Sequence, residues 1–335
     1  MPLAGLTAAL MLTGVVAAAC GDDSDAESLT VYSGRSESLI GPLLERFEEE
    51  TDITVEVRYG STTEMATTIL EEGANSPADV FIAQDTGGLG AVQQAGLFEP
   101  LPEDTLAKVA QQWRSDDNGW VGLSGRARVL VYNNETIDPA DLPDSILDLT
   151  DPEWSGRLGW APTNASFQAF VTALRVVHGD DAAREWLEGM MANDIMTYPG
   201  NSQIVEAAAA GEIEVGLVNH YYLHRYLAEQ GESYPARNYY TAPGDIGSVV
   251  GVAGAGILAS SDSMDAAQRL IDFMLSDESQ QYFADETYEY PVVTSVPANA
   301  DLPALDSIQP PDMDLDDFAD LEGTLALLRE VGALE

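Results

Sequence analysis

The fold class is decided by the stretch SLTVYSGRSESLIGPLLERFEEETDITVEVRYGSTTEMATTILEEGANSPADVFIA, which runs from Ser28 to Ala83. Three short runs in it predict strands, at 28–33, 53–60 and 78–83. The first run alternates between polar and apolar residues, as a strand with one buried face does, and the third is almost wholly apolar. An almost wholly apolar strand is typical of a sheet that is covered on both faces.

Two helices are predicted between these strands. The apolar side chains of residues 36–51 recur at the spacing of one helix face: Ile40, Leu43, Leu44 and Phe47. The tetrapeptide STTE at 61–64 is a capping box, and it predicts a second helix that ends near Gly73. The order strand, helix, strand, helix, strand predicts an α/β fold with a mostly parallel sheet flanked by helices.

A second α/β region begins at RARVLVYN, residues 126–133. Beyond it, the periodicity of apolar residues predicts further helices and strands. The helices are at 166–178, 181–191, 202–210, 221–230, 265–275, 279–285 and 315–331. The strands are at 213–219 and 248–259. A chain of 335 residues that is 45% hydrophobic exceeds what one core usually accommodates, so two lobes are expected.

The path of the chain out to one region and back predicts how these lobes are composed. We expect an N-terminal lobe from residues 28–127 plus about 252–300, and a C-terminal lobe from 128–251 plus about 301–335. Crossing strands would form the hinge. A cleft between two lobes is a preferred place for a ligand.

The N-terminus carries an export signal. Residues 3–19 are apolar and uncharged, and they end in small residues directly before Cys20. This resembles a bacterial lipoprotein signal, so residues 1–19 are predicted to be the signal, Cys20 the lipidated residue and 20–27 a flexible tether. A plain signal peptide and a membrane anchor are the alternatives, although the segment is short for a span. The expected location is extracytoplasmic, with the protein lipid-anchored to the cell membrane.

Composition narrows the class of function. Cys20 is the single cysteine, so disulfides, cysteine metal sites and thiol nucleophiles are not expected. Fourteen basic against fifty-seven acidic residues give a formal charge of −43 that is spread along the chain. Nucleic-acid binding needs clustered Lys and Arg and is excluded. A dispersed acidic surface is typical of a soluble protein from a high-salt habitat, and we expect a monomer.

The segment VNHYYLHRY, residues 218–226, carries the most informative chemistry. A strand ends at Asn219 and a helix follows at once, which places Tyr221 and Tyr222 at the carboxyl edge of a sheet, where open α/β folds bind ligands. A free phenol has a pKa of about 10, so two phenolates near neutrality require a strongly polarising cation, and Fe(III) fits this requirement best. Packing is the alternative role, as it is for the doublet Tyr239 and Tyr240 in a polar run.

The three histidines are weaker candidates. His220 and His224 share a helix face, but the glutamate of an HExxH motif is missing, so His220 is predicted to shape the turn. His178 ends a helix and is predicted to interact with the helix dipole. No GxSxG or GxxxxGK[ST] motif occurs, and GVAGAG fails the spacing of GxGxxG, so an enzyme is not predicted.

Several motifs together carry a family resemblance. In order they are VYSGRSE (31–37), SPADVFIAQD (76–85), LSGRARVLVYN (123–133), APTNASFQAF (161–170), GEIEVGLVNHYYL (211–223), AGAGILA (253–259) and EYPV (289–292). Over nearly the whole mature chain the sequence resembles the periplasmic ferric-ion-binding proteins of iron ABC transporters. The resemblance implies a two-lobed periplasmic-binding-protein fold, type II-like, that delivers Fe(III) to a permease and its ATPase. A binding protein of the same fold for a polyamine, thiamine or phosphonate is the alternative.

The resemblance also implies site residues. Tyr221 and Tyr222 match the family's iron-binding tyrosine pair. Gln84 stands where some members supply a glutamate, and Ser36 where some supply a histidine. Other members have a third tyrosine near residues 163–167, and this chain has none there. Two phenolates therefore remain, and another group is needed to complete the iron coordination.

A synergistic carbonate or phosphate is the expected partner of the iron, because two phenolates neutralise only two of three positive charges. The family's anion segment matches Asn164, Ala165 and Ser166, at a predicted helix N-terminus, together with Asn201 and Asn219. For Asn164 and Ser166, helix capping is the alternative.

Two charged residues near the cleft complete the candidates. Arg35 is predicted to clamp the anion through its planar guanidinium, with a surface ion pair as the alternative. Asp85 either hydrogen-bonds a ligand or caps the next helix, and capping is preferred.

Overall fold

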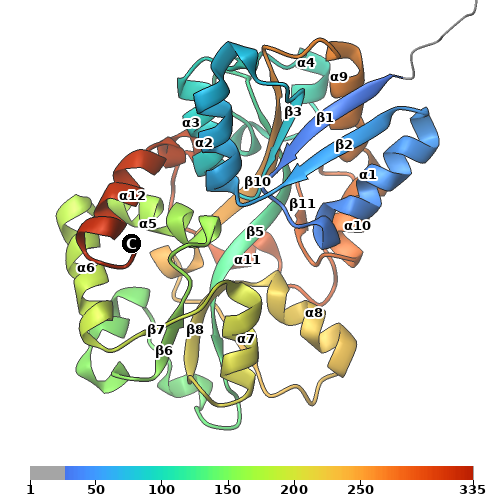
Figure 1. Ribbon diagram of the computed structural model, residues 1–335. Coiled ribbons are helices and arrows are strands. Elements are labelled where there is room, and N and C mark those ends of the chain that lie inside the picture. The colour runs from blue at the N-terminus through green and yellow to red at the C-terminus, as the bar shows by residue number, and fades with distance from the viewer. Residues whose placement is uncertain (1–26, 335) are drawn as a thin grey trace, which may run out of the picture.

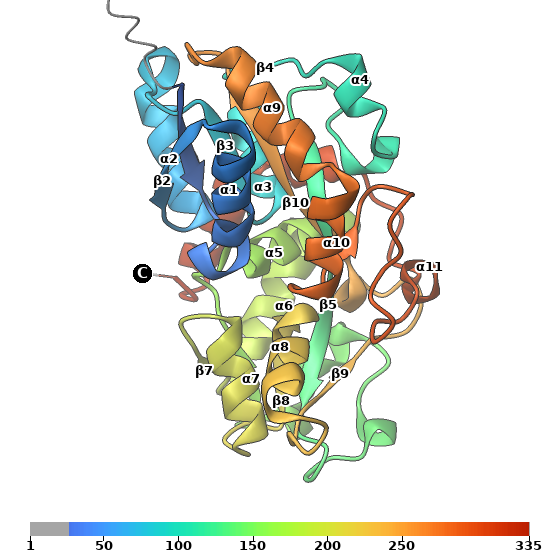
Figure 2. The ribbon, with the colours of Figure 1, turned by 90° about the vertical axis from the view of Figure 1, so that its right-hand side faces the viewer.

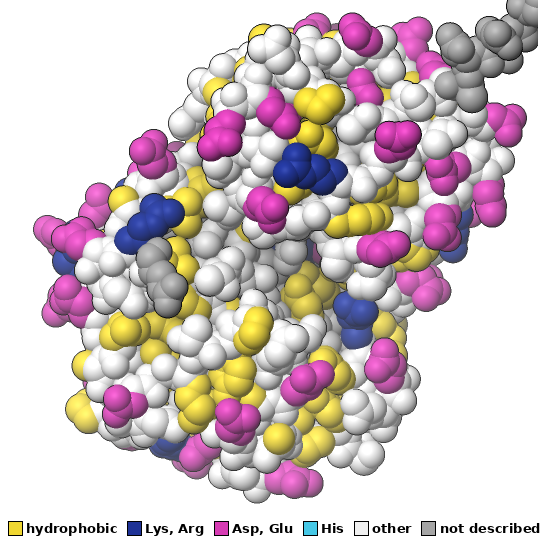
Figure 3. All heavy atoms as spheres, in the orientation of Figure 1, with side chains coloured by type: hydrophobic (Ala, Val, Ile, Leu, Met, Phe, Trp, Pro, Cys, Tyr) yellow, Lys and Arg dark blue, Asp and Glu magenta, His cyan; other side chains and the backbone are white. Residues whose placement is uncertain are grey.

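The structure, a computed structural model, describes residues 27–334 (Figures 1 and 2). The predicted signal, Cys20 and all of the tether except its last residue lie outside this range. Within it, no helix is long and apolar enough to cross a membrane. Acidic side chains are scattered over the face seen in Figure 3, and basic ones are few.

The N-terminal half of the sheet follows the sequence pattern closely. Strands β1 (Ser28–Ser33), β2 (Thr54–Tyr59) and β3 (Val80–Ala83) are parallel, with β1 in the middle. Helices α1 (Glu37–Thr51) and α2 (Thr62–Glu72) connect them. The apolar stripe predicted for α1 is buried, and the predicted cap of α2 forms, since Ser61 Oγ accepts a hydrogen bond from the Glu64 N–H at 3.1 Å.

Two long antiparallel strands lie at the centre of the fold. These are β5 (Val121–Tyr132) and β10 (Val250–Leu258), and β10 also pairs with β3. Along β5 the pairing partner changes: residues up to Ala127 pair with β10, and Arg128 onward pairs with β8 (Val215–Asn219). Strand β5 therefore runs from one half of the molecule into the other, as Figure 1 shows.

The other half of the sheet is built on β8. Strand β6 (Leu158–Trp160) lies parallel between β8 and β7 (Met196–Thr197), and β9 (Arg237–Tyr239) pairs antiparallel with β5. Its helices are α5 (Ala165–His178), α6 (Asp180–Ala192), α7 (Asn201–Ala209) and α8 (Tyr221–Gln230). The sheet as a whole has the order β2-β1-β3-β10-β5-β8-β6-β7, with parallel pairs on the outside and antiparallel pairs at the crossing strands.

The remaining elements extend or cover these halves; they are α3 (Thr86–Gln94), β4 (Phe98–Glu99), α4 (Glu103–Leu106), α9 (Met264–Met274), α10 (Asp277–Asp285), β11 (Tyr290–Pro291) and α11 (Leu305–Ile308).

The helix predicted at 315–331 is wrong as one element. The structure has a 3₁₀ turn at Leu315–Ala319 and then helix α12 (Leu321–Glu330). Asp320 interrupts the helix because its side chain accepts a hydrogen bond from the Gly323 N–H at 2.9 Å and so caps α12. The turn and α12 both pack against α3 of one half and α5 of the other, so this segment touches both halves.

The close approach of α3 to the 315–319 turn depends on a glycine. A Cβ added at Gly90 would lie 2.7 Å from the Ala319 Cα, which is backbone and cannot rotate away. We expect Gly90→Ala to lower the free energy of unfolding by about 1–3 kcal/mol, because overpacking outweighs the better helix propensity of alanine. Urea unfolding followed by circular dichroism measures it.

Gly41→Ala in α1 is the matched control. Its added Cβ would meet the flexible Glu37 Cγ at 3.3 Å and no backbone atom of another element, and the gain in helix propensity is opposed by the restriction that Pro42 places on the residue before it, so stability changes by less than about 1 kcal/mol. Equal effects of the two substitutions would contradict the packing of the turn on α3.

Candidate functional site

The tyrosine pair lies between the two halves of the protein. Strand β8 ends at Asn219 and α8 begins at Tyr221, as the sequence predicts. Tyr221 is fully buried and Tyr222 is partly buried. Their rings stack with centroids 4.4 Å apart and an interplanar angle of 27°. The two phenols therefore point in the same direction, which adjacent side chains can do at the first turn of a helix.

Gln84 joins this pair from the opposite half. It follows β3, and its Nε2 donates to the hydroxyls of Tyr221 at 3.3 Å and Tyr222 at 3.4 Å. The same amide nitrogen donates to Ser166 Oγ at 3.1 Å, at the N-terminus of α5. Nearby, Thr63 of α2 donates to Gln168 of α5 at 2.7 Å. The halves thus meet through polar contacts around the phenols.

The phenol of Tyr221 is held in its neutral form in this structure. Burial raises its pKa well above the usual value, and the neighbouring Tyr222 and Glu289 raise it further. Arg126 and Arg35 oppose these effects only in part. A cation of high charge would be required to deprotonate this phenol.

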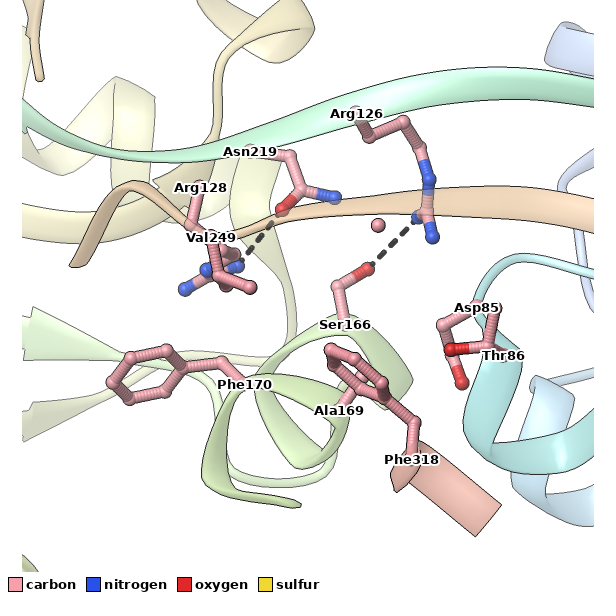
Figure 4. A pocket seen from close by; sticks show the side chains of 11 residues that line it. Asp85, Thr86, Arg126, Arg128, Ser166, Ala169, Phe170, Asn219, Val249 and Phe318 are labelled. Atoms are coloured by element: carbon pink, nitrogen blue, oxygen red, sulfur yellow. Dashed lines mark hydrogen bonds between the residues drawn. The ribbon is translucent and has the colours of Figure 1, made fainter. Parts of the chain in front are cut away.

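A small cavity of about 20 Å³, whose lining Figure 4 shows, is connected to the tyrosine pair through Ser166 and Gln84. It is lined by Asp85, Thr86, Arg126, Arg128, Ser166, Ala169, Phe170, Asn219, Val249, Gly251 and Phe318. Ser166 connects it to the tyrosines, since its hydroxyl accepts hydrogen bonds from both Gln84 and Arg126. The volume is enough for a water molecule.

Two guanidinium groups give this cavity its charge. Arg126 and Arg128 are two residues apart on β5, so their side chains leave the strand on one face. Arg126 donates to Ser166 Oγ at 3.3 Å, and Arg128 donates to Asn219 Oδ1 at 3.1 Å. Within residues 27–334, neither forms a salt bridge. Burial and the neighbouring Arg126 lower the pKa of Arg128 to about 9.

This arrangement is suited to an anion. A buried charge is costly unless it is paired, and guanidinium groups bind oxyanions with directed hydrogen bonds. The sequence pattern places Arg126 and Arg128 in a strand and by itself assigns no binding role to them. The available signal was two arginines at strand spacing in an otherwise apolar run, in a chain with only 14 basic residues.

Some predicted anion residues lie at this cavity and others support it. Ser166 and Asn219 line it, and Asn201 Oδ1 accepts a hydrogen bond from the Asn219 N–H at 3.1 Å. Asn164 caps α5 by accepting from the Ser166 N–H at 3.0 Å, which is the capping alternative. Ala165 is buried as the first residue of α5 and is not among the lining residues.

Arg35 has a different environment from the one expected. It is fully buried, forms a salt bridge with Glu289 at 2.6 Å and donates to Ser124 Oγ at 2.9 Å. The nearby carboxylate of Glu289 outweighs burial and raises the pKa of Arg35. Neither the surface ion pair nor a lining position in the cavity is seen. Ser36 is exposed and its hydroxyl contacts Ser38.

Asp85 lines the cavity and also occupies the N-cap position of α3. Its side chain makes no capping hydrogen bond of standard geometry, but the N–H groups of Gly87 and Gly88 interact with its carboxyl group and act to lower its pKa, so the preferred capping role is met only in part. The pKa of Asp85 is raised by burial, and Arg126 and these N–H groups offset this in part.

His220 shapes the turn before α8, as predicted. Its Nδ1 accepts a hydrogen bond from the Ala127 N–H at 3.1 Å, and its Nε2 lies 2.8 Å from the Tyr288 carbonyl oxygen. Burial lowers its pKa to about 3, so the ring is neutral and Nε2 carries the proton. His224 stacks on Tyr288 instead of joining a metal cluster. His178 is exposed in the last turn of α5.

Histidine, cysteine and carboxylate ligands do not form a cluster of three anywhere in the part of the chain that the structure describes. The polar groups that converge between the halves are two phenols, an amide, a hydroxyl and two guanidinium groups. Fold and site together define a two-lobed α/β binding protein whose ligand site lies between the lobes.

Comparison with known proteins agrees with this class. Residues 75–319 match the family model described as bacterial extracellular solute-binding protein. The chain is 35% identical over 315 residues to the Fe(3+)-binding periplasmic protein of Serratia marcescens, covering 93% of this chain and 92% of that one. It is 31% identical over 307 residues to the major ferric iron-binding protein of Neisseria meningitidis serogroup B, covering 91% and 92%.

A solved structure agrees as well. Iron-bound HitA from Pseudomonas aeruginosa superposes with a TM-score of 0.88 at 35% identity, over 91% of this chain and 99% of that one. The chain belongs to the bacterial extracellular solute-binding proteins. This is a family of binding proteins for transport and not of enzymes.

The buried charge of Arg128 predicts an unusual stability effect. We expect Arg128→Met to raise the free energy of unfolding by about 1–4 kcal/mol in buffer without oxyanions, because it removes an unpaired buried cation. The same change abolishes the gain in melting temperature that added phosphate gives the unchanged protein. Thermal unfolding with and without phosphate measures both effects.

Arg269→Met, at a side chain that is half exposed, is the control and leaves the phosphate effect intact. A loss of stability in Arg128→Met without oxyanion, with the phosphate effect retained, would show that Arg128 has another role.

Proposed function

We propose that this protein captures ferric iron together with a synergistic anion between its lobes and delivers it to an ABC permease. The observation that carries the proposal is the convergence of the stacked Tyr221 and Tyr222 phenols with Gln84, beside a cavity that holds two unpaired guanidinium groups. The phenols are the iron ligands of the proposal, and the guanidinium groups hold the anion.

Charge supports this division of roles. Fe(III) deprotonates both phenols and leaves one positive charge, Arg126 and Arg128 add two more, and the carboxylate of Asp85 removes one. An anion on Ser166 and Asn219 neutralises the remaining excess of two in part or in full and supplies oxygen atoms to the iron. Ser166, which accepts from both Gln84 and Arg126, connects the two parts of the site. Carbonate and phosphate are compact oxyanions that two guanidinium groups can bind with directed hydrogen bonds.

The ligand also accounts for closure of the lobes. Gln84 comes from one half and the tyrosines and Ser166 from the other, so a ligand held by both sets favours the closed form. The ligand shifts the equilibrium between open and closed lobes only as far as it binds the closed form more tightly than the open form. The permease and its ATPase are the proposed partners, and they would recognise the closed lobes.

The proposed location is outside the cytoplasmic membrane. The named relatives are periplasmic or ferric iron-binding proteins, and this supports an extracytoplasmic site of action. Attachment through a lipid on Cys20, and a monomeric state, stay predictions.

Iron binding is tested by titrating the metal-stripped protein with Fe(III) citrate, with and without bicarbonate or phosphate. A red-orange charge-transfer band is expected, because a phenolate donates electron density to Fe(III). Tyr221→Phe and Tyr222→Phe each weaken the band and reduce affinity by more than about 100-fold, since each removes a direct ligand and loss of even a supporting partner costs 10–100-fold.

Tyr239→Phe is the control, from the doublet that lies away from the site, and it leaves the band unchanged. No band with any anion would refute the iron proposal. Saturable binding of thiamine, a polyamine or a phosphonate under the same conditions would then establish the organic-ligand alternative.

Gln84 offers a second test of the same site. Gln84→Glu replaces the amide that contacts both phenols by a carboxylate, which is a hard anionic ligand for Fe(III). We expect about 10-fold tighter iron binding and a weaker dependence on added phosphate, as measured by citrate competition.

Gln111→Glu introduces the same charge at an exposed position and has no such effect. Unchanged affinity and unchanged anion dependence in Gln84→Glu would place the iron away from Gln84.

A further inference from the structure

The side chain of Asp85 has no role in the functions described so far. Its residue is 4% exposed, and it lines the cavity together with Arg126, Arg128 and Ser166 (Figure 4). Its Oδ2 is buried and has no hydrogen-bond partner within residues 27–334. A buried carboxylate oxygen without a partner is costly, and a ligand that donates to it removes this cost.

The guanidinium groups of Arg126 and Arg128 are donors toward an anion. Guanidinium groups can only donate hydrogen bonds, and the Arg126 Nε is itself buried and without a partner among the residues that the structure describes. An ionised carboxylate can only accept. The cavity therefore presents guanidinium donors together with an unpartnered acceptor oxygen at Asp85.

The acceptor oxygen of Asp85 distinguishes oxyanions that carry a proton from oxyanions that carry none. A fully deprotonated oxyanion has only lone pairs to turn toward Asp85 Oδ2, and the two negative oxygens repel. An oxyanion that keeps a proton donates its O–H to the same oxygen while its other oxygens accept from the arginines. At neutral pH, inorganic phosphate and bicarbonate keep a proton and sulfate has none.

We propose that Asp85 is a specificity-determining residue that accepts a hydrogen bond from a protonated oxyanion, so that the site takes hydrogen phosphate or hydrogen carbonate and rejects sulfate. The proposal rests on the proposed function, because it names the class of anion that accompanies the iron. A site with a fixed hydrogen-bond donor or acceptor binds an analogue weakly when the analogue leaves that donor or acceptor unpaired, and the same rule applies to Asp85.

Burial raises the pKa of Asp85, and Arg126 and the N–H groups of Gly87 and Gly88 offset this rise only in part by favouring the carboxylate. The N–H groups belong to the first turn of α3, where the helix dipole also favours a negative charge. Arg126 and these N–H groups belong to the protein, so their effect on the pKa of Asp85 is present before any ligand binds.

The test compares phosphate, bicarbonate and sulfate as partners of Fe(III) in the unchanged protein and in Asp85→Asn, at neutral pH and equal ionic strength. The charge-transfer band reports iron binding, and calorimetry with each anion alone reports anion binding. In the unchanged protein, phosphate binds at least about 100-fold more tightly than sulfate.

In Asp85→Asn the difference between phosphate affinity and sulfate affinity is expected to shrink or change sign, because the asparagine amide can donate a hydrogen bond to sulfate. Phosphate affinity falls at least about 10-fold and sulfate affinity rises. Asp262→Asn, at an exposed carboxylate, is the matched control for the loss of one charge and retains the original order.

The possible failures are distinguishable. Equal support of the iron band by sulfate and phosphate in the unchanged protein overturns the role of Asp85 and leaves the iron function standing. An unchanged phosphate preference in Asp85→Asn, in a variant with a native circular-dichroism spectrum, overturns it as well. Absence of the band with every anion refutes the iron function instead, and calorimetry still measures the anion preference.

Discussion

The site depends on two buried positive charges that form no salt bridge within residues 27–334, although the Asp85 carboxyl lines the same cavity. Arg126 and Arg128 leave one face of β5 where this strand changes its pairing from β10 to β8, which is the point at which the two halves of the protein meet. A buried guanidinium without a counter-ion destabilises the fold. Their positions are therefore best explained by a negative ligand that arrives from solution, and the other parts of the site surround that ligand.

The tyrosine pair has the complementary property. Burial of Tyr221 keeps its phenol neutral, and its loss of a proton requires a strongly charged cation in the same place. In the proposed complex, the anion lowers the free-energy cost of placing the cation in the site, and the cation lowers the cost of placing the anion there. In the same complex the arginines stabilise the anion, and the anion and phenolates stabilise the iron, while Gln84 and Ser166 join the two halves beside them. A site that is incomplete without both ligands is suited to capture and later release.

Local pattern predicted the secondary structure well, because strand alternation, helical periodicity and the STTE cap are all written within a few residues. It failed at Asp320, where an otherwise helical stretch is cut by a side chain that caps the second part. The tyrosine pair was recognisable from its place at a strand-to-helix turn. The environment of Arg35 was not, since its partner Glu289 lies 254 residues away along the chain. The roles of Arg126, Arg128 and Asp85 likewise depend on which strands become neighbours, which no local pattern specifies.

The most direct test of this account is a crystal structure of the iron-loaded protein, with the metal located by anomalous diffraction at the iron absorption edge. The account predicts one iron within bonding distance of the Tyr221 and Tyr222 phenolate oxygens, and an oxyanion that contacts the iron, Arg126 and Ser166. Iron bound elsewhere, or at the tyrosines with the arginine cavity empty of any anion, would contradict it.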